Sequence, residues 1–289
     1  MFFGGSSWKY EGWLGQIYDS SRYETRGKFA KTRFEKECLS EYAETFSSVC
    51  GDFTFYTFYS REFFAKLFAQ VPSTFRFGFK VPEVITNPSP HSSRSSYAEE
   101  RHDYLNPEIT TALFLERLAP FAKQIGYLVF EFVERRGATP DDNKVFLDQL
   151  DTFFEKLPKF LPYSVEIRTK SLLGPEYFAV LRKHGVAHCF NSWTRMPSIG
   201  EQLEYKDAFT AGFSVARLLL RPGNTYNKAV KSFEPFDSIK DPYPQGYSDA
   251  ARLATTARAK QLWFAFAVNN RLTGNAPQTV EAIMDELDK

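Results

Sequence analysis

The chain alternates short apolar runs with longer amphipathic runs, and this alternation is the feature that most restricts its fold. Residues two apart share a face in a strand, whereas residues three or four apart share a face in a helix. Eight candidate strands lie at 1–7, near 49, and at 75–80, 127–132, 163–168, 186–190, 213–220 and 262–268. Eight candidate helices alternate with them, among them 34–46, 109–121, 139–157, 175–183, 248–260 and 275–287. Repeated βα units of this kind predict a parallel sheet covered by helices.

Eight such units predict an α/β fold, the (β/α)8 TIM barrel, formed by residues 1–289 as a single domain. The length of 289 residues exceeds the roughly 250 residues of a typical barrel of this kind. Three strand-to-helix segments are long, at 15–33, 82–107 and 222–246. In a barrel such loops gather at the C-terminal ends of the strands, where the active sites of this fold are found. The sequence therefore predicts that the functional site lies at the C-terminal end of the barrel strands.

Charge and cysteine content narrow the class of protein. Lys and Arg total 36 against 35 Asp and Glu, so the formal net charge is only +1. Nucleic-acid modules usually have a basic excess, so nucleic acid is not favoured as a partner. Cys38, Cys50 and Cys189 are widely spaced and odd in number, which is typical of free thiols in a reducing compartment. No run approaches about 18 uninterrupted apolar residues. With no secretory signal pattern at its start, the sequence predicts a cytoplasmic protein without a membrane span.

Short motifs stand at nearly every strand end. In chain order they are Gly5-Ser6-Ser7-Trp8-Lys9-Tyr10 with Trp13, Gly15 and Tyr18; Thr54-Phe55-Tyr56; Phe77-Gly78-Phe79-Lys80-Val81-Pro82 with Ile85-Thr86; Val165-Glu166-Ile167-Arg168; Arg221, Gly223 and Tyr226; and Asn269-Asn270 with Gly274 and Ala276. Together and in this order they resemble the YecE-like family, a widespread bacterial and archaeal domain of unknown function. The resemblance covers essentially the whole chain. It implies a TIM barrel and no established activity.

Three positions depart from the family pattern. Cys50 stands where the family usually has Glu, Asn87 where it often has His, and Glu131 where it usually has Gln. A mechanism that needs the second-strand carboxylate or the third-motif histidine is therefore not expected in this chain.

Charged residues recur on the inward face of the predicted strands. Glu166 and Arg168 point the same way because they are two residues apart, and the apolar Val165 and Ile167 point the other way. The same count places Lys80 opposite the neighbouring phenylalanines. The charged residues expected at the barrel mouth are Lys80, Glu131, Glu166, Arg168 and Arg221. This set has a modest surplus of positive charge.

A cationic mouth suits a small anionic ligand such as a phosphate or carboxylate. Arginine can grip either group through two parallel hydrogen bonds, and lysine supplies a compact charge. Aromatic and amide side chains expected to bind the ligand with these charges are Trp8, Tyr56, Tyr226, Asn269 and Asn270. The alternative is that the charged residues, Glu131 and Arg217 above all, only pair with one another, because buried charges need partners.

The leading hypothesis is a metal-independent enzyme that acts on a small anionic substrate by acid–base or carbonyl chemistry. Its catalytic candidates are Lys80, Glu166 and Arg168. Glu166 is the acid–base candidate, because a semi-buried carboxylate can have its pKa tuned toward neutrality. Lys80 orients the anion or, as a second option, forms a Schiff base. Arg168 and Arg221 anchor the substrate. No cofactor is expected.

Other chemistries have less support in the sequence. Of the four histidines, His184 is expected at a helix end on the opposite face and His188 in the core. Only His91 and His102, in the segment 82–107, are expected near the mouth. No histidine–carboxylate spacing resembles a metal motif, so no metal site is expected. Cys50 fits a small buried residue better than a nucleophile.

A second class of function stays open: a non-catalytic binding protein for a nucleotide or nucleic-acid fragment. Four cations in the long loops motivate it: Arg94, Arg101, Lys228 and Lys231. Turnover separates the two hypotheses. For either, the ligand is expected at the C-terminal mouth, in contact with at least two of Trp8, Lys80, Glu166, Arg168, Arg221 and Asn269.

Overall fold

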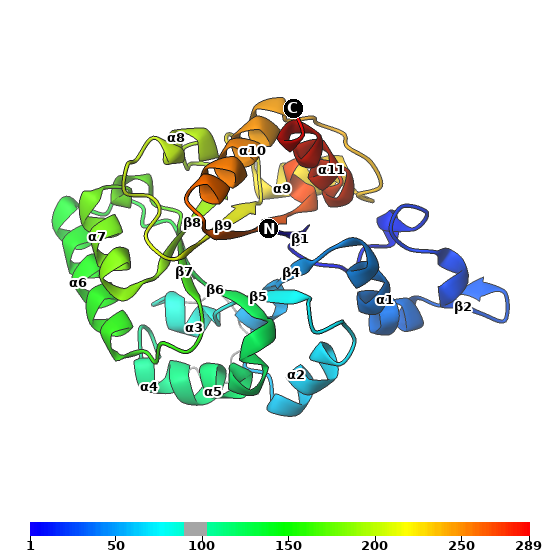
Figure 1. Ribbon diagram of the computed structural model, residues 1–289, viewed down its shortest axis with the longest axis horizontal. Coiled ribbons are helices and arrows are strands. Elements are labelled where there is room, and N and C mark those ends of the chain that lie inside the picture. Colours follow the sequence, from blue (N-terminus) through cyan, green and yellow to red (C-terminus); the bar gives the residue numbers. More distant parts are fainter. Residues whose placement is uncertain (90–102) are drawn as a thin grey trace.

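The computed structural model describes residues 1–89 and 103–289. Its main strands are β1 (Phe2–Gly5), β4 (Ser48–Gly51), β5 (Arg76–Lys80), β6 (Ile125–Phe132), β7 (Tyr163–Ile167), β8 (Ala187–Ser192), β9 (Phe213–Leu218) and β10 (Trp263–Val268). They pair in parallel, in the order β1-β10-β9-β8-β7-β6-β5-β4. The sheet curls until β1 returns beside β4, which makes a nearly closed barrel (Figure 1). The eight strands and the (β/α)8 fold predicted from the alternation are confirmed.

Helices surround this sheet (Figure 1). They are α1 (Lys31–Thr45), α2 (Arg61–Phe68), α3 (Glu83–Thr86), α4 (Pro107–Thr110), α5 (Glu116–Leu118), α6 (Pro140–Lys156), α7 (Pro175–His184), α8 (Ile199–Leu203), α9 (Tyr226–Phe233), α10 (Pro244–Ala259) and α11 (Ala276–Leu287). The predicted start of α6 is confirmed, because Thr139 and Asp142 form a capping box. None of the helices in the described part of the chain is both long enough and apolar enough to cross a membrane.

The single helix predicted at 109–121 is wrong in detail. A π-helical turn, η4 (Thr111–Leu115), precedes α5, and a 3-10 turn, η5 (Ala119–Gln124), follows it. Pro120 lies in η5, and proline has no backbone N–H with which to continue an α-helical ladder. The segment is therefore helical, as its apolar spacing predicts, but it changes from π-helical to α-helical to 3-10 geometry.

The seam between β1 and β4 is held by a side chain, because these strands stand at the two ends of the hydrogen-bonded order. The Tyr42 hydroxyl of α1 accepts a hydrogen bond from Gly5 N at 2.6 Å and donates one to Ser48 O at 3.0 Å. A Cβ on Gly4 would stand 1.7 Å from the same Ser48 oxygen. Glycine at this position therefore lets the two strands approach.

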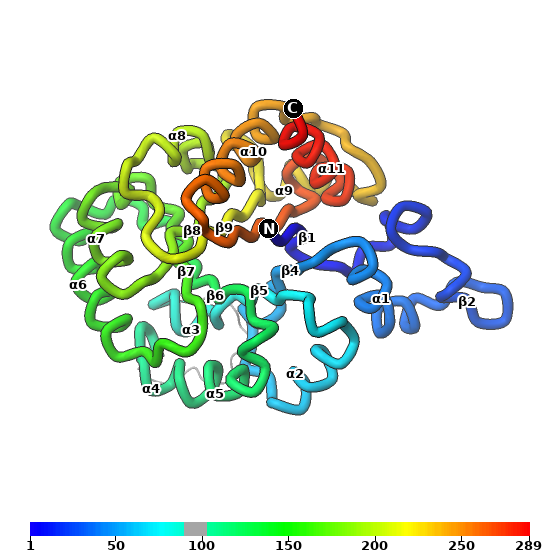
Figure 2. The backbone as a smooth tube through the Cα atoms, in the orientation of Figure 1, coloured from blue at the N-terminus to red at the C-terminus, as the bar shows by residue number. Residues whose placement is uncertain are grey.

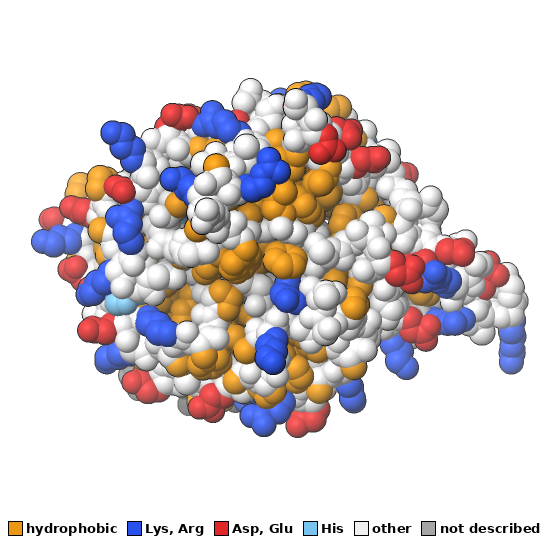
Figure 3. Space-filling view, in the orientation of Figure 1, with side chains coloured by type: hydrophobic (Ala, Val, Ile, Leu, Met, Phe, Trp, Pro, Cys, Tyr) orange, Lys and Arg blue, Asp and Glu red, His pale blue; other side chains and the backbone are white. Residues whose placement is uncertain are grey.

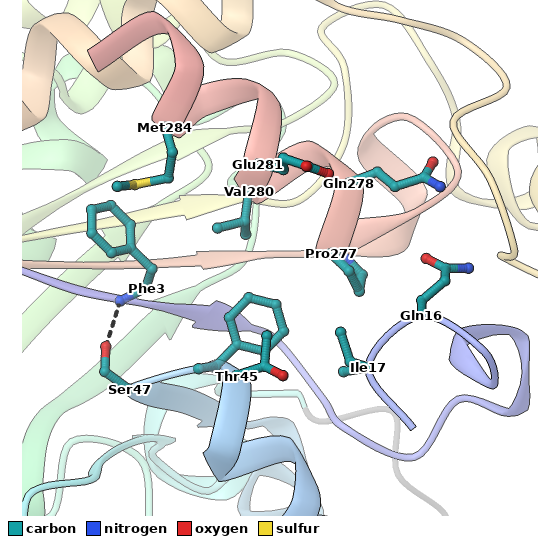
Figure 4. Close-up of a pocket in the computed structure, with 11 residues that line it drawn as sticks. Phe3, Gln16, Ile17, Thr45, Ser47, Pro277, Gln278, Val280, Glu281 and Met284 are labelled. Atoms are coloured by element: carbon teal, nitrogen blue, oxygen red, sulfur yellow. Dashed lines mark hydrogen bonds between the residues drawn. The ribbon is translucent and has the colours of Figure 1, made fainter. Parts of the chain in front are cut away.

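A cavity of about 550 Å³ lies outside the seam, between α1 and α11. Figure 4 shows Val280 and Met284 of α11 on one side of it and the hydrogen bond from Phe3 N to Ser47 Oγ, 3.1 Å long, nearby. Of the residues that line this cavity, Glu281 is the only charged one. The cavity therefore offers no cation to an anionic ligand.

Alternation along the strands sorts side chains into two packed layers. Phe77 and Phe79 of β5 point outward and pack against Phe68 of α2, with ring centroids 4.7 and 6.2 Å apart. The inner layer is a separate cluster that includes Cys50, Tyr127, Val129, Cys189 and Val215. The barrel is therefore packed with side chains, as this fold requires. On the face shown in Figure 3, hydrophobic side chains gather toward the centre and charges of both signs are mixed around the rim.

The three long segments differ from one another. Segment 15–33 carries a small hairpin, β2 (Glu24–Thr25) with β3 (Lys28–Phe29), which projects away from the barrel (Figure 2). Segment 82–107 includes α3, and its residues 90–102 lie outside the described residues. Segment 222–246, predicted as a loop, contains α9. The Thr225 hydroxyl caps the start of this helix by accepting from Lys228 N.

Candidate functional site

Six charged residues from five strands converge at the C-terminal half of the barrel. They are Asp52 just after β4, Lys80 at the end of β5, Glu131 in β6, Glu166 in β7 with Arg168 just after it, and Arg217 in β9. We call these six the charged floor. The predicted grouping of Lys80, Glu166 and Arg168 on one side of the barrel is confirmed, since their contacts all lead to the same carboxylates.

Glu131 is the centre of the charged floor. Its Oε2 accepts hydrogen bonds from Lys80 Nζ at 2.9 Å, Arg168 Nη2 at 2.8 Å and Arg217 Nη1 at 2.9 Å. Burial alone would raise the pKa of Glu131, but the facing cations Arg168, Lys80 and Arg217 outweigh burial and hold that pKa well below its usual range. Glu131 is therefore an ionised anchor for three cations.

Glu166 stands beside Glu131, because the two residues are register partners on β6 and β7. Its Oε1 accepts from Arg168 Nε at 3.0 Å, and its Oε2 accepts from Arg217 Nη1 at 2.5 Å. The side chain is fully buried. Both oxygens are thus taken by guanidinium groups, so the position expected for an acid–base catalyst is a support for the two arginines.

Arg217 connects the floor to the surface. Its Nη2 donates to Asp52 Oδ1 at 2.8 Å, and the Asp52 side chain keeps 31% of its surface exposed. Burial alone would lower the pKa of Arg217, but Glu166, Asp52 and the neighbouring acidic groups raise it well above the usual value. Among the described residues no donor lies on Asp52 Oδ2, so that oxygen is free to accept from a ligand.

The charges of the floor balance. Three cations face three carboxylates once Arg217 and Asp52 are counted with the residues expected from sequence. Arg221, expected to add positive charge here, instead pairs with Asp241 at 2.9 Å and lies over the Tyr243 ring. A surplus of positive charge must therefore come from another residue.

Aromatic rings hold two of the floor cations in place. Lys80 Nζ lies 3.5 Å from the centroid of the Phe55 ring, and Arg168 Cζ lies 3.7 Å from that of the Trp193 ring. Cations over ring faces at such distances are attracted by the ring quadrupole. The Arg168 side chain is 13% exposed, and its Nη1 has no acceptor among the described residues. The Arg168 side chain is thus held in one orientation and keeps a donor group, Nη1, that a ligand could use.

Arg271 supplies the missing positive charge. It lies in the 3-10 turn η7 (Asn270–Leu272), just after β10, with its guanidinium 4.5 Å from the centroid of the Tyr226 ring. No carboxylate of the described residues lies within ion-pair distance of it, and its buried Nε has no hydrogen-bond partner among them. Burial raises the pKa of Tyr10, and the charge of Arg271 acts against that rise. Arg271 is therefore a partly buried, unpaired cation among mouth residues.

Tyr56 and Tyr226 form the outer rim of the same mouth. Both rings are exposed, by 57% and 50%. Burial raises the pKa of Tyr56, and its electrostatic neighbours include Asp52, Tyr226 and Arg271. The rim phenols therefore stand between the charged floor and Arg271.

Asn269 and Asn270 are buried and serve the loop that carries Arg271. Asn269 donates to Ser6 Oγ at 2.5 Å, and its own oxygen accepts from the Arg271 backbone N–H at 2.9 Å. Asn270 Oδ1 accepts from Trp13 Nε1 and from Ala276 N. The two amides therefore order the loop that carries Arg271, and the buried Nδ2 of Asn270 has no hydrogen-bond partner among the described residues.

The remaining residues singled out from sequence fall as follows. Burial raises the pKa of the Cys50 thiol to about 12, and Cys50 is fully buried as expected. His184 ends α7 and pairs with Asp151, and His188 is in the core. Asn87 is buried and donates to Glu83. His91, His102, Arg94 and Arg101 lie outside the described residues.

Two further observations bear on other ligands. Lys228 and Lys231 are exposed on α9, as part of its solvent face. The described residues contain no group of three or more His, Cys, Asp or Glu side chains that could hold a metal ion.

Sequence reasoning missed Asp52, Phe55, Trp193 and Arg271. A signal existed for two of them. Asp52 is two residues beyond Cys50 and so shares its inward face, and Arg271 follows the last strand at the predicted working end. The aromatic partners had no signal of their own, because ring contacts with Lys80 and Arg168 depend on loops whose paths the sequence does not reveal.

Known proteins place this architecture in a family. The chain matches the family described as "Protein of unknown function DUF72" over residues 2–289. A DUF72 family protein of Enterococcus faecalis V583 is 17% identical, with a TM-score of 0.66 over 100% of this chain and 95% of that chain. One of Thermotoga maritima MSB8 is also 17% identical, with a TM-score of 0.66 over 100% and 99% of the two chains.

At such identity the two solved structures support the fold alone. Among curated proteins none matches the chain. The match over residues 2–289 nevertheless identifies the relatives of the whole barrel, and they are the ones that the strand-end motifs resemble. The chain belongs to the DUF72 family, which is the YecE-like family.

Proposed function

We propose that the barrel mouth binds a small anion, a phosphate or a carboxylate, and that the chain is a metal-independent enzyme acting on it by acid–base or carbonyl chemistry. The observation that carries the proposal is Arg271. The charged floor is neutral as a set, and the partly buried Arg271 guanidinium has no ion-pair partner among the described residues. A bound anion would supply the missing partner, because a buried charge is costly until it is paired.

In this proposal three cationic groups contact the anion. Arg271 provides its guanidinium, Arg168 its free Nη1, and Lys80 an ammonium already oriented by Glu131 and Phe55. Hydrogen bonds from charged donors to an anion are shorter and stronger than those between neutral groups. The rim ring of Tyr56 can cover the planar face of a carboxylate or of an attached group.

The chemical role expected for Glu166 passes to Asp52 in this proposal. Asp52 has one oxygen fixed by Arg217 and the other free, and its side chain reaches solvent. A base needs both orientation and access to the proton that it removes. Lys80 donates to Glu131, which suits binding of an anion better than attack as a neutral amine.

Replacement of Arg271 tests the anion site. We expect Arg271→Gln to weaken binding of inorganic phosphate by about 1.5–3 kcal/mol, because the charge-assisted contact is lost while the side chain stays polar. Isothermal titration measures the affinity. Arg258→Gln is the matched control, since Arg258 is an exposed arginine near the end of α10 without an ion pair among the described residues.

Equal phosphate affinity in Arg271→Gln and wild type would remove the proposal. Arg168→Ala should weaken binding as well, but its unfolding free energy must be measured beside it because Arg168 also holds Glu131 and Glu166. Incubation with a library of phosphorylated and carboxylated metabolites then separates an enzyme from a binding protein. Product formation that is lost in Asp52→Asn supports catalysis, whereas saturable binding without product supports binding alone.

A further inference from the structure

A hollow opens at the C-terminal end of the barrel, between α1 and α2. It has a volume of about 480 Å³, within the range of small-molecule sites. Its lining comes from the loop after β1, from the end of β4 and from the two helices: Ser6, Ser7, Trp8, Lys9, Glu35, Lys36, Asp52, Phe53, Tyr59, Phe63, Lys66, Leu67 and Gln70. We call this hollow the α1–α2 groove.

Aromatic rings form the walls of the α1–α2 groove. Trp8 and Phe53 meet edge to face with centroids 5.9 Å apart, and Tyr59 and Phe63 stack with centroids 4.1 Å apart. Trp8 is 7% exposed although it lines the groove, so its ring is held by packing. Rigid aromatic walls of this kind favour a planar, apolar occupant.

The charge of the groove is positive. Lys9, Lys36 and Lys66 line it, and no carboxylate of the described residues lies within ion-pair distance of any of the three ammonium groups. Two acidic residues share the lining, Glu35 and Asp52, and Asp52 is already bonded to Arg217. Three unpaired ammonium groups around one hollow raise the local concentration of anions.

Asp52 joins the groove to the mouth. Its carboxylate lines the groove and accepts from Arg217 of the charged floor. A molecule that lies along the groove therefore contacts a residue that also binds the charged floor. Asp52 is therefore shared by the groove and the charged floor.

We propose that the α1–α2 groove is a subsite for a planar aromatic group that carries an anionic substituent. The aromatic group packs against the rings of Trp8, Phe53, Tyr59 and Phe63. The substituent is held by Lys9, Lys36 and Lys66. The inference rests on the proposed function in one respect: the groove holds the part of the same substrate that lies beyond Asp52. Binding of an aromatic anion to the groove itself is testable without that link.

Three probes separate the parts of the proposal: 1-naphthyl phosphate, uncharged 1-naphthol and inorganic phosphate. We expect 1-naphthyl phosphate to bind about tenfold more tightly than either of the other two, because only it uses both the walls and the lysines. Naphthyl fluorescence anisotropy and isothermal titration measure the affinities. Equal affinities for 1-naphthyl phosphate and 1-naphthol would show that the lysines contribute nothing and would overturn the assignment.

Exposed lysines can be changed without risk to the core. Lys66→Gln should raise the Kd of 1-naphthyl phosphate about threefold, and the triple variant Lys9→Gln, Lys36→Gln, Lys66→Gln roughly thirtyfold. Lys206→Gln is the matched control, since Lys206 is exposed and unpaired among the described residues and precedes β9, at the opposite end of the barrel. An unchanged Kd in the triple variant overturns the groove.

Failure of this inference is distinguishable from failure of the mouth proposal. If Arg271→Gln loses inorganic phosphate while the triple variant binds 1-naphthyl phosphate like wild type, the groove proposal fails and the mouth proposal stands. If the triple variant loses 1-naphthyl phosphate while Arg271→Gln binds inorganic phosphate normally, the mouth proposal fails and the groove stands as a separate site.

Discussion

Glu131 is the residue on which most of the buried charge depends. One of its oxygens serves Lys80, Arg168 and Arg217 at once. Two charges brought out of water cost several kcal/mol each unless they are well paired. Removal of the central carboxylate would therefore leave three cations facing too little negative charge.

We expect Glu131→Gln to lower the free energy of unfolding by about 3–5 kcal/mol, the usual cost of breaking a buried ion pair from one side. Urea unfolding at neutral pH measures it. Glu134→Gln is the control: Glu134 follows the same strand but pairs with Arg195 and Arg136 near the surface, and such pairs contribute about 0–1 kcal/mol. A loss in Glu131→Gln no larger than in Glu134→Gln would contradict the central role of Glu131.

The seam between β1 and β4 is the weak point among the elements. Seven strand pairs have backbone ladders, whereas this one is bridged by side chains: Tyr42 of α1 joins Gly5 N to Ser48 O, and Ser47 Oγ accepts from Phe3 N. A helix side chain thus completes the barrel. The bridge couples the placement of α1 to closure of the sheet.

Loss of the bridging hydroxyl should destabilise the fold. Tyr42→Phe leaves a buried N–H and a buried C=O without this partner, which we expect to cost about 1–3 kcal/mol in unfolding free energy. Tyr247→Phe offers a matched control, because the buried Tyr247 hydroxyl has no hydrogen-bond partner among the described residues. That change should be neutral or slightly stabilising. Equal thermal shifts in the two variants would mean that the bridge does not stabilise the seam.

The stability of the whole molecule should depend on pH through His188. Burial lowers the pKa of His188 to about 4 from the usual 6.5, while its ring contacts Tyr177 and Gln202. As pH falls below about 6.5, His188 becomes protonated in the unfolded chain. In the folded chain it becomes protonated only near pH 4. The unfolded state binds more protons in this pH range. The contribution of neutral His188 to the free energy of unfolding is therefore complete above pH 6.5 and is lost as pH falls toward 4.

Between pH 7 and pH 5 this single group should account for a loss of about 2 kcal/mol in unfolding free energy. The loss is measured by urea unfolding at the two pH values, in wild type and in His188→Gln. Glutamine has no titrating group, so the loss of unfolding free energy between the two pH values should be smaller in the variant by that amount, whatever its absolute stability. A pH dependence identical to that of wild type would assign the effect to other groups.

Much of the architecture could be predicted because the spacing of apolar residues along the chain matches the periodicity of strands and helices. Periods of two and of three to four residues located the eight strands and the main helices. The two-residue period also told which side chains of each strand face inward. Lys80, Glu131, Glu166 and Arg168 were therefore assigned to one end of the barrel from their positions alone, and they meet there.

Only the tertiary structure decided which charges pair. Arg217 and Glu131 are 86 residues apart in the chain, and nothing local in either segment indicates the other. Closure of the barrel brings them together, pairs the buried Glu166 with two guanidinium groups and leaves one oxygen of Asp52 without a donor among the described residues. It also leaves Arg271 without a carboxylate among the described residues. The sequence alone determined which charged residues are present and which side of each strand they occupy. Their pairing depends on distances across the barrel, and these are set only when the strands are arranged in order.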